Sequence, residues 1–157
     1  MAELFANNQN TNDVIDISLD SSKRKRFRID KDDNRIIELD TTDLNIVDRF
    51  QKKYNELVTL IEESFRDLSK SEDPDFGNVG ESIANVDAKM RQIMDEIFNS
   101  NISEICAPYG SMLDPINGKF RFEYIFETLI PLYENDINSE LRKLNTRVQK
   151  HTSKYIK

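Results

Sequence analysis

The sequence predicts a mainly α-helical (α+β) fold, with an N-terminal β-hairpin or small antiparallel sheet packed on a bundle of about four helices. Apolar residues recur every third or fourth position through most of the chain, which is the helical period. Three short segments near the N-terminus instead alternate between apolar and polar residues, as strands do. With 157 residues, of which 38% are hydrophobic, we expect one domain over 13–157 after a disordered polar arm over 1–12.

Residues 13–40 are predicted to form the β-hairpin region. The alternation begins at 14–19, where Ile15, Ile17 and Leu19 have the spacing of a half-buried strand. Segments 23–29 and 35–39 alternate in the same way and flank the turn-forming residues 32–34. Because an isolated hairpin is only marginally stable in water, we expect its apolar face to pack on helices.

The middle of the chain is predicted to hold two helices over 43–69 and 80–99, separated by an exposed loop over 70–79. The loop contains Pro74 and Gly77, which interrupt regular structure. The first helix has the longest apolar stripe of the sequence, formed by Leu44, Val47, Phe50, Tyr54, Leu57, Ile61, Phe65 and Leu68. The stripe of the second contains Ile83, Val86, Met90, Ile93 or Met94, and Ile97.

The last third is predicted to contain a Pro/Gly-rich loop over 108–119, a helix over 120–135 that bends near Pro131, and a basic helix over 137–155. Residues 120–124 also alternate like a strand, and Asn117-Gly118 is a favoured hairpin turn. Their continuation into an apolar run fits a buried helix better, so we predict a helix there and keep the strand as the alternative.

Charge is distributed unevenly along the chain. The net charge is −7, which argues against a general nucleic-acid binder. Residues 61–140 contain 6 basic and 17 acidic residues, whereas 141–157 contain 6 basic residues and no carboxylate. We consider two interpretations of the basic end: intramolecular complementarity at a helix C-terminus, and a docking surface for an acidic partner or a second copy. The basic run 23–26 is expected to protect an edge strand from unwanted pairing.

Residues suited to catalysis or metal binding are sparse. Cys106 and His151 are the single cysteine and histidine, so a catalytic triad or a histidine metal site lacks partners, and no intrachain disulfide can form. We predict that Cys106 is a buried small hydrophobe and that His151 is solvated or caps a helix. Residues 30–34 open like a calcium loop, but Arg35 and Thr41 replace its required Gly and Glu, so we predict a hairpin turn. The expectation is a non-enzymatic protein without a cofactor or metal.

Protein–protein contact is the remaining class of function. Six aromatic residues fall within 25 positions around the Pro/Gly-rich loop, where they form either core or a partner-binding surface. The candidate partner-binding residues are Arg142, Lys143, Arg147, Lys150, Tyr109, Phe122 and Tyr124. We expect no membrane partner, because the apolar runs are far shorter than the roughly 20 residues of a spanning helix.

Two stretches resemble a known family over roughly residues 23–155. They are 25–44, with Lys25–Asp30 followed by Asp33–Leu44, and 105–118, with Ile105–Met112, Asp114-Pro115 and Asn117-Gly118; the basic finish around 148–152 also fits. The chain resembles the tail assembly chaperones and tail accessory proteins of long-tailed phages and prophages of Gram-positive bacteria. This family offers no catalytic motif whose residues could be transferred to the chain.

The resemblance implies a function in virion assembly. A tail assembly chaperone would bind the hydrophobic, helical tape measure protein or another tail protein in the host cytoplasm and keep it soluble. The alternatives are a structural component of the virion, such as a tail or connector ring protein that forms a homo-oligomer, and a small phage-encoded inhibitor or regulator of a host protein.

Overall fold

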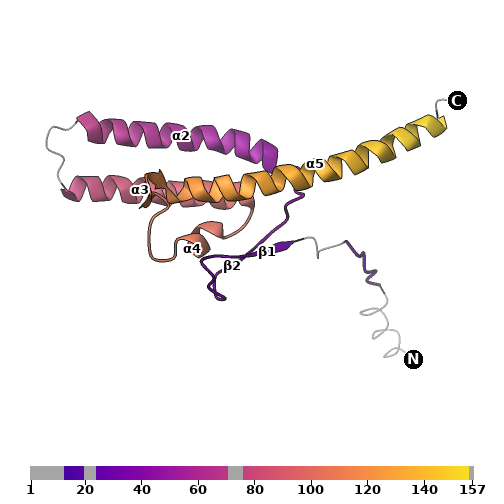
Figure 1. The fold of residues 1–157 in the computed structure, drawn as a ribbon, viewed down its shortest axis with the longest axis horizontal. Helices are drawn as coiled ribbons and strands as arrows, with labels where there is room; N and C mark the ends of the chain where they lie inside the picture. The colour runs from indigo at the N-terminus through magenta and orange to yellow at the C-terminus, as the bar shows by residue number, and fades with distance from the viewer. Residues whose placement is uncertain (1–12, 20–23, 71–75, 156–157) are drawn as a thin grey trace.

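The fold was obtained as a computed structural model that describes residues 13–19, 24–70 and 76–155 (Figure 1). It is mainly α-helical with a two-stranded antiparallel sheet before the helices, which confirms the predicted class. The elements are β1 (Lys25–Arg28), β2 (Ile36–Leu39), α2 (Ile46–Lys70), α3 (Phe76–Phe98), α4 (Ile102–Cys106), β3 (Pro115–Ile116), β4 (Lys119–Phe120) and α5 (Arg121–Tyr155). The predicted arm over 1–12 lies outside the described residues.

The predicted hairpin is present, and its turn has the backbone that the Asp-rich sequence favours. Strands β1 and β2 pair antiparallel, with Phe27 opposite Ile37. Asp30 and Lys31 adopt positive φ angles of 53° and 59°, and residues 30–34 form a hairpin turn as predicted. Ile37 and Leu39 on β2 are buried in the core, whereas β1 is largely exposed. The hairpin therefore packs on the core mainly through β2, and Phe27 of β1 is partly buried against the same core.

The strand predicted for 14–19 does not form. This segment has no regular structure, and its apolar side chains, Val14, Ile15, Ile17 and Leu19, are 70–85% exposed. A half-buried strand needs a neighbouring strand and an apolar surface beneath it, and the described part of the single chain supplies neither at this place. The prediction of a half-buried strand from the alternating pattern is therefore wrong for this segment.

A polar contact fastens the hairpin to the middle of α5. The ammonium of Lys25 lies 2.6 Å from Oδ2 of Asp136, and the hydroxyl of Thr41 donates to the same oxygen. Thr41 is almost completely buried. Both hydrogen bonds favour the charged carboxylate and so hold the pKa of Asp136 below its usual value. The bond from Lys25 has the larger effect, and the bond from Thr41 has the smaller one.

The two predicted central helices are present with shifted ends. Helix α2 begins at Ile46 rather than 43, after Asp43 accepts a hydrogen bond from the backbone N–H of Asn45. Helix α3 begins at Phe76 rather than 80, so the interval between the helices is shorter than predicted. It ends at Phe98 because Asn99 adopts a left-handed φ of 50°, and the next N–H bonds back to the carbonyl of Asp95.

The sequence prediction of two helices at the C-terminus is wrong, because α5 is a single helix of 35 residues from Arg121 to Tyr155. Pro131 lies inside it. A proline within a helix removes one hydrogen bond and costs about 3 kcal/mol. Buried side chains on both sides of it, at Phe126 and Leu129 before and Tyr133 and Ile137 after, attach the helix to one core and offset that cost.

The alternative for residues 120–124 was a strand in place of a helix, and the structure shows where each begins and ends. Lys119 and Phe120 form the short strand β4, which pairs with β3 through a turn at Asn117 and Gly118 with φ angles of 51° and 81°. These angles are those of a type I′ hairpin turn. The helix begins at Arg121, so residues 121–124 are helical as predicted, and only Phe120 of the alternative strand lies in a strand.

The core lies where α2, α3, α5, β2 and the segment around α4 meet. Phe126 on α5 is 7% exposed and contacts rings on two other helices: Phe50 and Tyr54 of α2 at centroid distances of 5.5 and 6.1 Å, and Phe98 of α3 at 5.8 Å. Such ring pairs add to the gain from burial alone. Phe126 therefore joins the three long helices.

We expect Phe126→Ala to lower the free energy of unfolding by about 3 to 5 kcal/mol, because it removes a buried ring and leaves a cavity between three helices. Phe65→Ala is the matched control, since that ring is 36% exposed and should cost only about 1 kcal/mol. Urea unfolding measures both values. Equal losses in the two variants would contradict the central position of Phe126.

We expect Asp136→Asn to lower the free energy of unfolding at pH 7, with a deficit that shrinks as the pH falls below about 4. The folded-state pKa of Asp136 lies below the unfolded-state value, so its stabilisation is complete above the unfolded pKa and disappears as the pH falls through the folded pKa. Urea unfolding of both proteins across pH 2–7 tests this. A deficit that stays constant over that range would show that the charge of Asp136 does not matter.

Candidate functional site

A groove runs between α2 and α5, and we call it the α2–α5 groove. Two adjoining hollows of about 440 and 400 Å³ form it, and they share Phe50, Ile130 and Glu134. Its lining also includes Ile46, Val47, Gln51, Tyr54, Phe122, Glu123, Phe126, Glu127, Pro131, Tyr133, Ile137, Asn138 and Leu141. The groove follows α5 from Phe122 to Leu141, and most of its lining is apolar.

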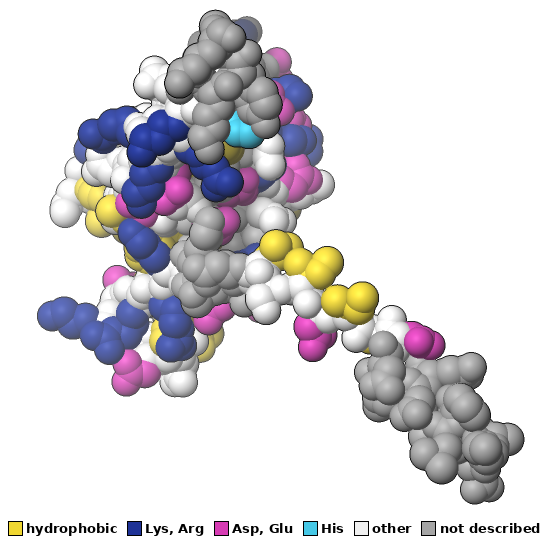
Figure 2. Space-filling view, turned by 90° about the vertical axis from the view of Figure 1, so that its right-hand side faces the viewer, with side chains coloured by type: hydrophobic (Ala, Val, Ile, Leu, Met, Phe, Trp, Pro, Cys, Tyr) yellow, Lys and Arg dark blue, Asp and Glu magenta, His cyan; other side chains and the backbone are white. Residues whose placement is uncertain are grey.

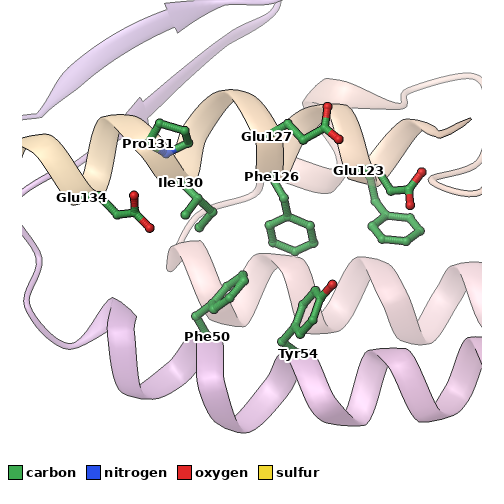
Figure 3. A pocket seen from close by; sticks show the side chains of 9 residues that line it. Phe50, Tyr54, Glu123, Phe126, Glu127, Ile130, Pro131 and Glu134 are labelled. Atoms are coloured by element: carbon green, nitrogen blue, oxygen red, sulfur yellow. The ribbon is translucent and has the colours of Figure 1, made fainter.

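Aromatic rings form the floor of the groove at one end. Phe50 and Tyr54 are stacked on α2 with centroids 5.0 Å apart, and both meet the edge of Phe126 (Figure 3). Phe50 is only partly buried, and Tyr54 is 39% exposed. Aromatic rings in a protein core are usually covered by other side chains. This pair is partly open, so it offers apolar surface on which another helix could pack.

Carboxylates from α5 form one edge of the groove. Glu123, Glu127 and Glu134 project from α5 beside the apolar floor (Figure 3). Glu123 accepts a hydrogen bond of 2.9 Å from the N–H of Phe120, and Glu127 lies 2.9 Å from the ammonium of Lys119. Two of the three carboxylates thus have partners within the chain, and the edge still carries more negative than positive charge.

Helix α5 continues far past the body of the protein (Figure 1). We call residues 141–155 the projecting segment; its side chains from 141 to 152 are all exposed. Leu141, Leu144 and Val148, which are 44%, 47% and 59% exposed, continue the stripe that is buried at Ile137. One apolar stripe therefore runs along both the packed and the projecting part of α5, and only the packed part is covered.

The predicted basic residues all lie on the projecting segment. Arg142, Lys143, Arg147 and Lys150 are exposed, and Figure 2, which looks toward this end of the molecule, shows Lys and Arg side chains gathered there. Lys143 forms a weak contact of 3.3 Å with Glu140. Lys143, Arg147 and Lys150 follow one flank of the apolar stripe at helical spacing, and Arg142 lies on the other flank.

The three predicted aromatic residues have different environments. Phe122 is 6% exposed and stacks 5.5 Å from Phe120, so its side chain belongs mainly to the core and only borders one end of the α2–α5 groove. Tyr124 is half-buried, and its hydroxyl donates to the carbonyl of Ile116 at 2.7 Å. Tyr109 alone of the three is fully exposed.

Three arginines fix the loop that presents Tyr109. Arg35 donates to the carbonyls of Ile105 and Cys106 at 2.9 Å each, and Arg121 donates to that of Cys106 at 3.3 Å. Arg91 donates to the carbonyls of Ala107, at 2.8 Å, and Gly110. Cations at these carbonyls complement the negative end of α4. Sequence analysis did not find these arginines, because their partners are up to 71 positions away.

Cys106 and His151 lie in different environments, so they do not form a nucleophile–base pair. Cys106 is buried in α4, as predicted, and burial raises its pKa to about 11. His151 lies on the exposed projecting segment of α5. Among residues 13–19, 24–70 and 76–155, no group of three or more His, Cys, Asp or Glu side chains is placed to hold a metal ion.

Comparison with known proteins adds no family to this description. No family model matches the chain, and neither the curated proteins nor the solved structures include a significant match. Among the described residues, no helix has the length and apolar character needed to cross a membrane.

We expect Cys106 to react very slowly with iodoacetamide in the folded protein. At pH 8 a thiol with a pKa of about 11 is roughly 0.1% thiolate, and burial blocks access in addition. Mass spectrometry of the alkylated protein with and without 8 M urea (roughly full unfolding strength for a small domain) measures this. Rapid modification of the folded chain would contradict the buried position of the thiol.

Proposed function

We propose that this protein is a non-enzymatic assembly factor that binds an amphipathic helix of a partner protein in the α2–α5 groove. The observation that carries the proposal is the groove itself, whose apolar floor includes the open pair Phe50 and Tyr54 and whose edge is acidic. Grooves of this kind between two helices are a common way to bind a third helix.

The dimensions of the groove suit a helix. Along α5 from Phe122 to Leu141 it extends for about 29 Å, the length of roughly five helical turns. Helices α2 and α5 both pack against α3, so a helix in the groove would complete a four-helix arrangement. The glutamates at the edge favour an occupant with basic residues beside its apolar stripe.

The resemblance to tail assembly chaperones of long-tailed phages supplies the identity of the partner in this proposal. The tape measure protein of such phages is long, hydrophobic and helical, and binding in the groove would cover an apolar stripe of it during assembly in the host cytoplasm. The groove offers apolar contact to that stripe, and the acidic edge keeps the complex soluble.

A structural role in the virion is the second candidate. It is favoured by the exposed stripe of Leu141, Leu144 and Val148, since a subunit of a tail or connector ring needs a surface for its neighbour. Mass spectrometry of purified particles separates the two functions. A chaperone is absent from the finished particle, whereas a ring subunit is present in several copies.

We expect the full chain to co-elute in size-exclusion chromatography with the tape measure protein encoded beside it. Val47→Lys with Glu134→Lys should abolish co-elution, because it places positive charge in the groove at two exposed positions without removing core side chains. The matched control is Leu132→Lys with Glu104→Lys, two exposed residues outside the groove lining. Failure of the wild-type chain to bind, or equal binding by the groove variant, would reject this function.

A further inference from the structure

We propose that the α2–α5 groove also accepts the projecting segment of a second copy of this chain. The inference rests on the proposed function in one respect, since the groove must be able to bind a helix. The occupant comes from the protein itself, so the chain would associate with copies of itself. A partner protein would then have to displace the projecting segment from the groove before it could bind there.

The apolar surfaces of the two sites match in kind and in length. The projecting segment of 15 residues is about 22 Å long, which fits within the groove of about 29 Å. Leu144 and Val148 supply the exposed apolar stripe that such a groove binds. Within one chain the contact cannot form, because the projecting segment continues α5 away from its own groove (Figure 1).

The charges of the two sites are opposite. The groove edge carries Glu123, Glu127 and Glu134, whereas residues 141–155 contain five basic residues and no carboxylate. Complementary potentials of this kind steer association and fix the orientation of the partners. The only other long helices, α2 and α3, carry mixed charge, so within the described chain the projecting segment is the helix best suited to this groove.

The flank occupied by the basic residues determines the direction of insertion. Lys143, Arg147 and Lys150 lie on one side of the stripe. For a right-handed helix placed over the groove, insertion parallel to α5 of the receiving copy sets this flank beside the glutamates, whereas antiparallel insertion sets Asn145 and Gln149 there. Parallel insertion is head-to-tail, so each copy would use its groove for one neighbour and its projecting segment for another.

A complementation experiment tests the proposal on the full chain. The projecting-segment variant has Leu144→Asp and Val148→Asp, and the groove variant has Val47→Lys and Glu134→Lys; all four positions are exposed. The matched control for the first is Leu132→Asp with Ile116→Asp, which are also exposed but lie outside both sites. Sedimentation velocity over a range of concentrations gives the mass, and thermal melting followed by circular dichroism verifies folding.

For the wild type and for the control variant, we expect the mass of the sedimenting species to rise with concentration and to exceed that of a dimer. Each variant alone should associate at least about tenfold more weakly, and a 1:1 mixture should regain a two-chain species, because one variant keeps the groove and the other keeps the projecting segment. Wild-type association that stops at the dimer, a variant that associates like the wild type, or a mixture that stays monomeric would overturn the proposal.

The same variants separate this proposal from the proposed function. The projecting-segment variant retains an intact groove, so it should bind the tape measure protein at least as well as the wild type does. Persistent self-association of that variant would reject the second-copy proposal alone. Unchanged tape measure binding by the groove variant would reject the proposed function.

Discussion

Helix α5 extends beyond the body on which it packs, and its apolar stripe continues past that body to Val148. Over the first half, Phe126, Leu129 and Tyr133 are buried against the other helices. Over the second half the stripe continues in a segment whose side chains are exposed to solvent. Helical structure in proteins depends largely on such packing, so the projecting segment gains stability when something covers it. The apolar floor of the α2–α5 groove, beside the packed half, likewise gains stability when another helix covers it.

The spacing of apolar residues predicted most of this fold, because the faces that pack in the body are the ones that carry the regularly spaced apolar side chains. The stripe through Phe50 and Leu57 identified α2, and alternation on both sides of an Asp-rich turn identified the hairpin. The single helix α5 was missed because Pro131 is a strong local breaker, whereas the burial that overcomes it is tertiary. Helix α4 also depends on a tertiary contact: Asp95 of α3 accepts hydrogen bonds from the backbone N–H and the hydroxyl of Ser103 in its first turn.

The candidate site was only partly predictable. The basic residues at the C-terminus and the exposure of Tyr109 agree with a role at the surface, but Phe122 is buried. The groove could not be predicted, because it depends on which faces of α2 and α5 remain open after both pack on α3. A signal was nevertheless present in the continuous spacing from Ile130 through Ile137 to Leu144, which extends one stripe across the predicted break.

The central claim is that the α2–α5 groove binds a helix, and photo-crosslinking from inside the groove tests it most directly. Gln51 is exposed and lines the groove, so a benzophenone amino acid at this position reports on its occupant. In a mixture of isotopically light and heavy chains, the account predicts mixed light–heavy crosslinks that map to residues 141–155, lost when the tape measure protein is added. Crosslinks confined to a single chain, or the absence of any helical occupant, would contradict it.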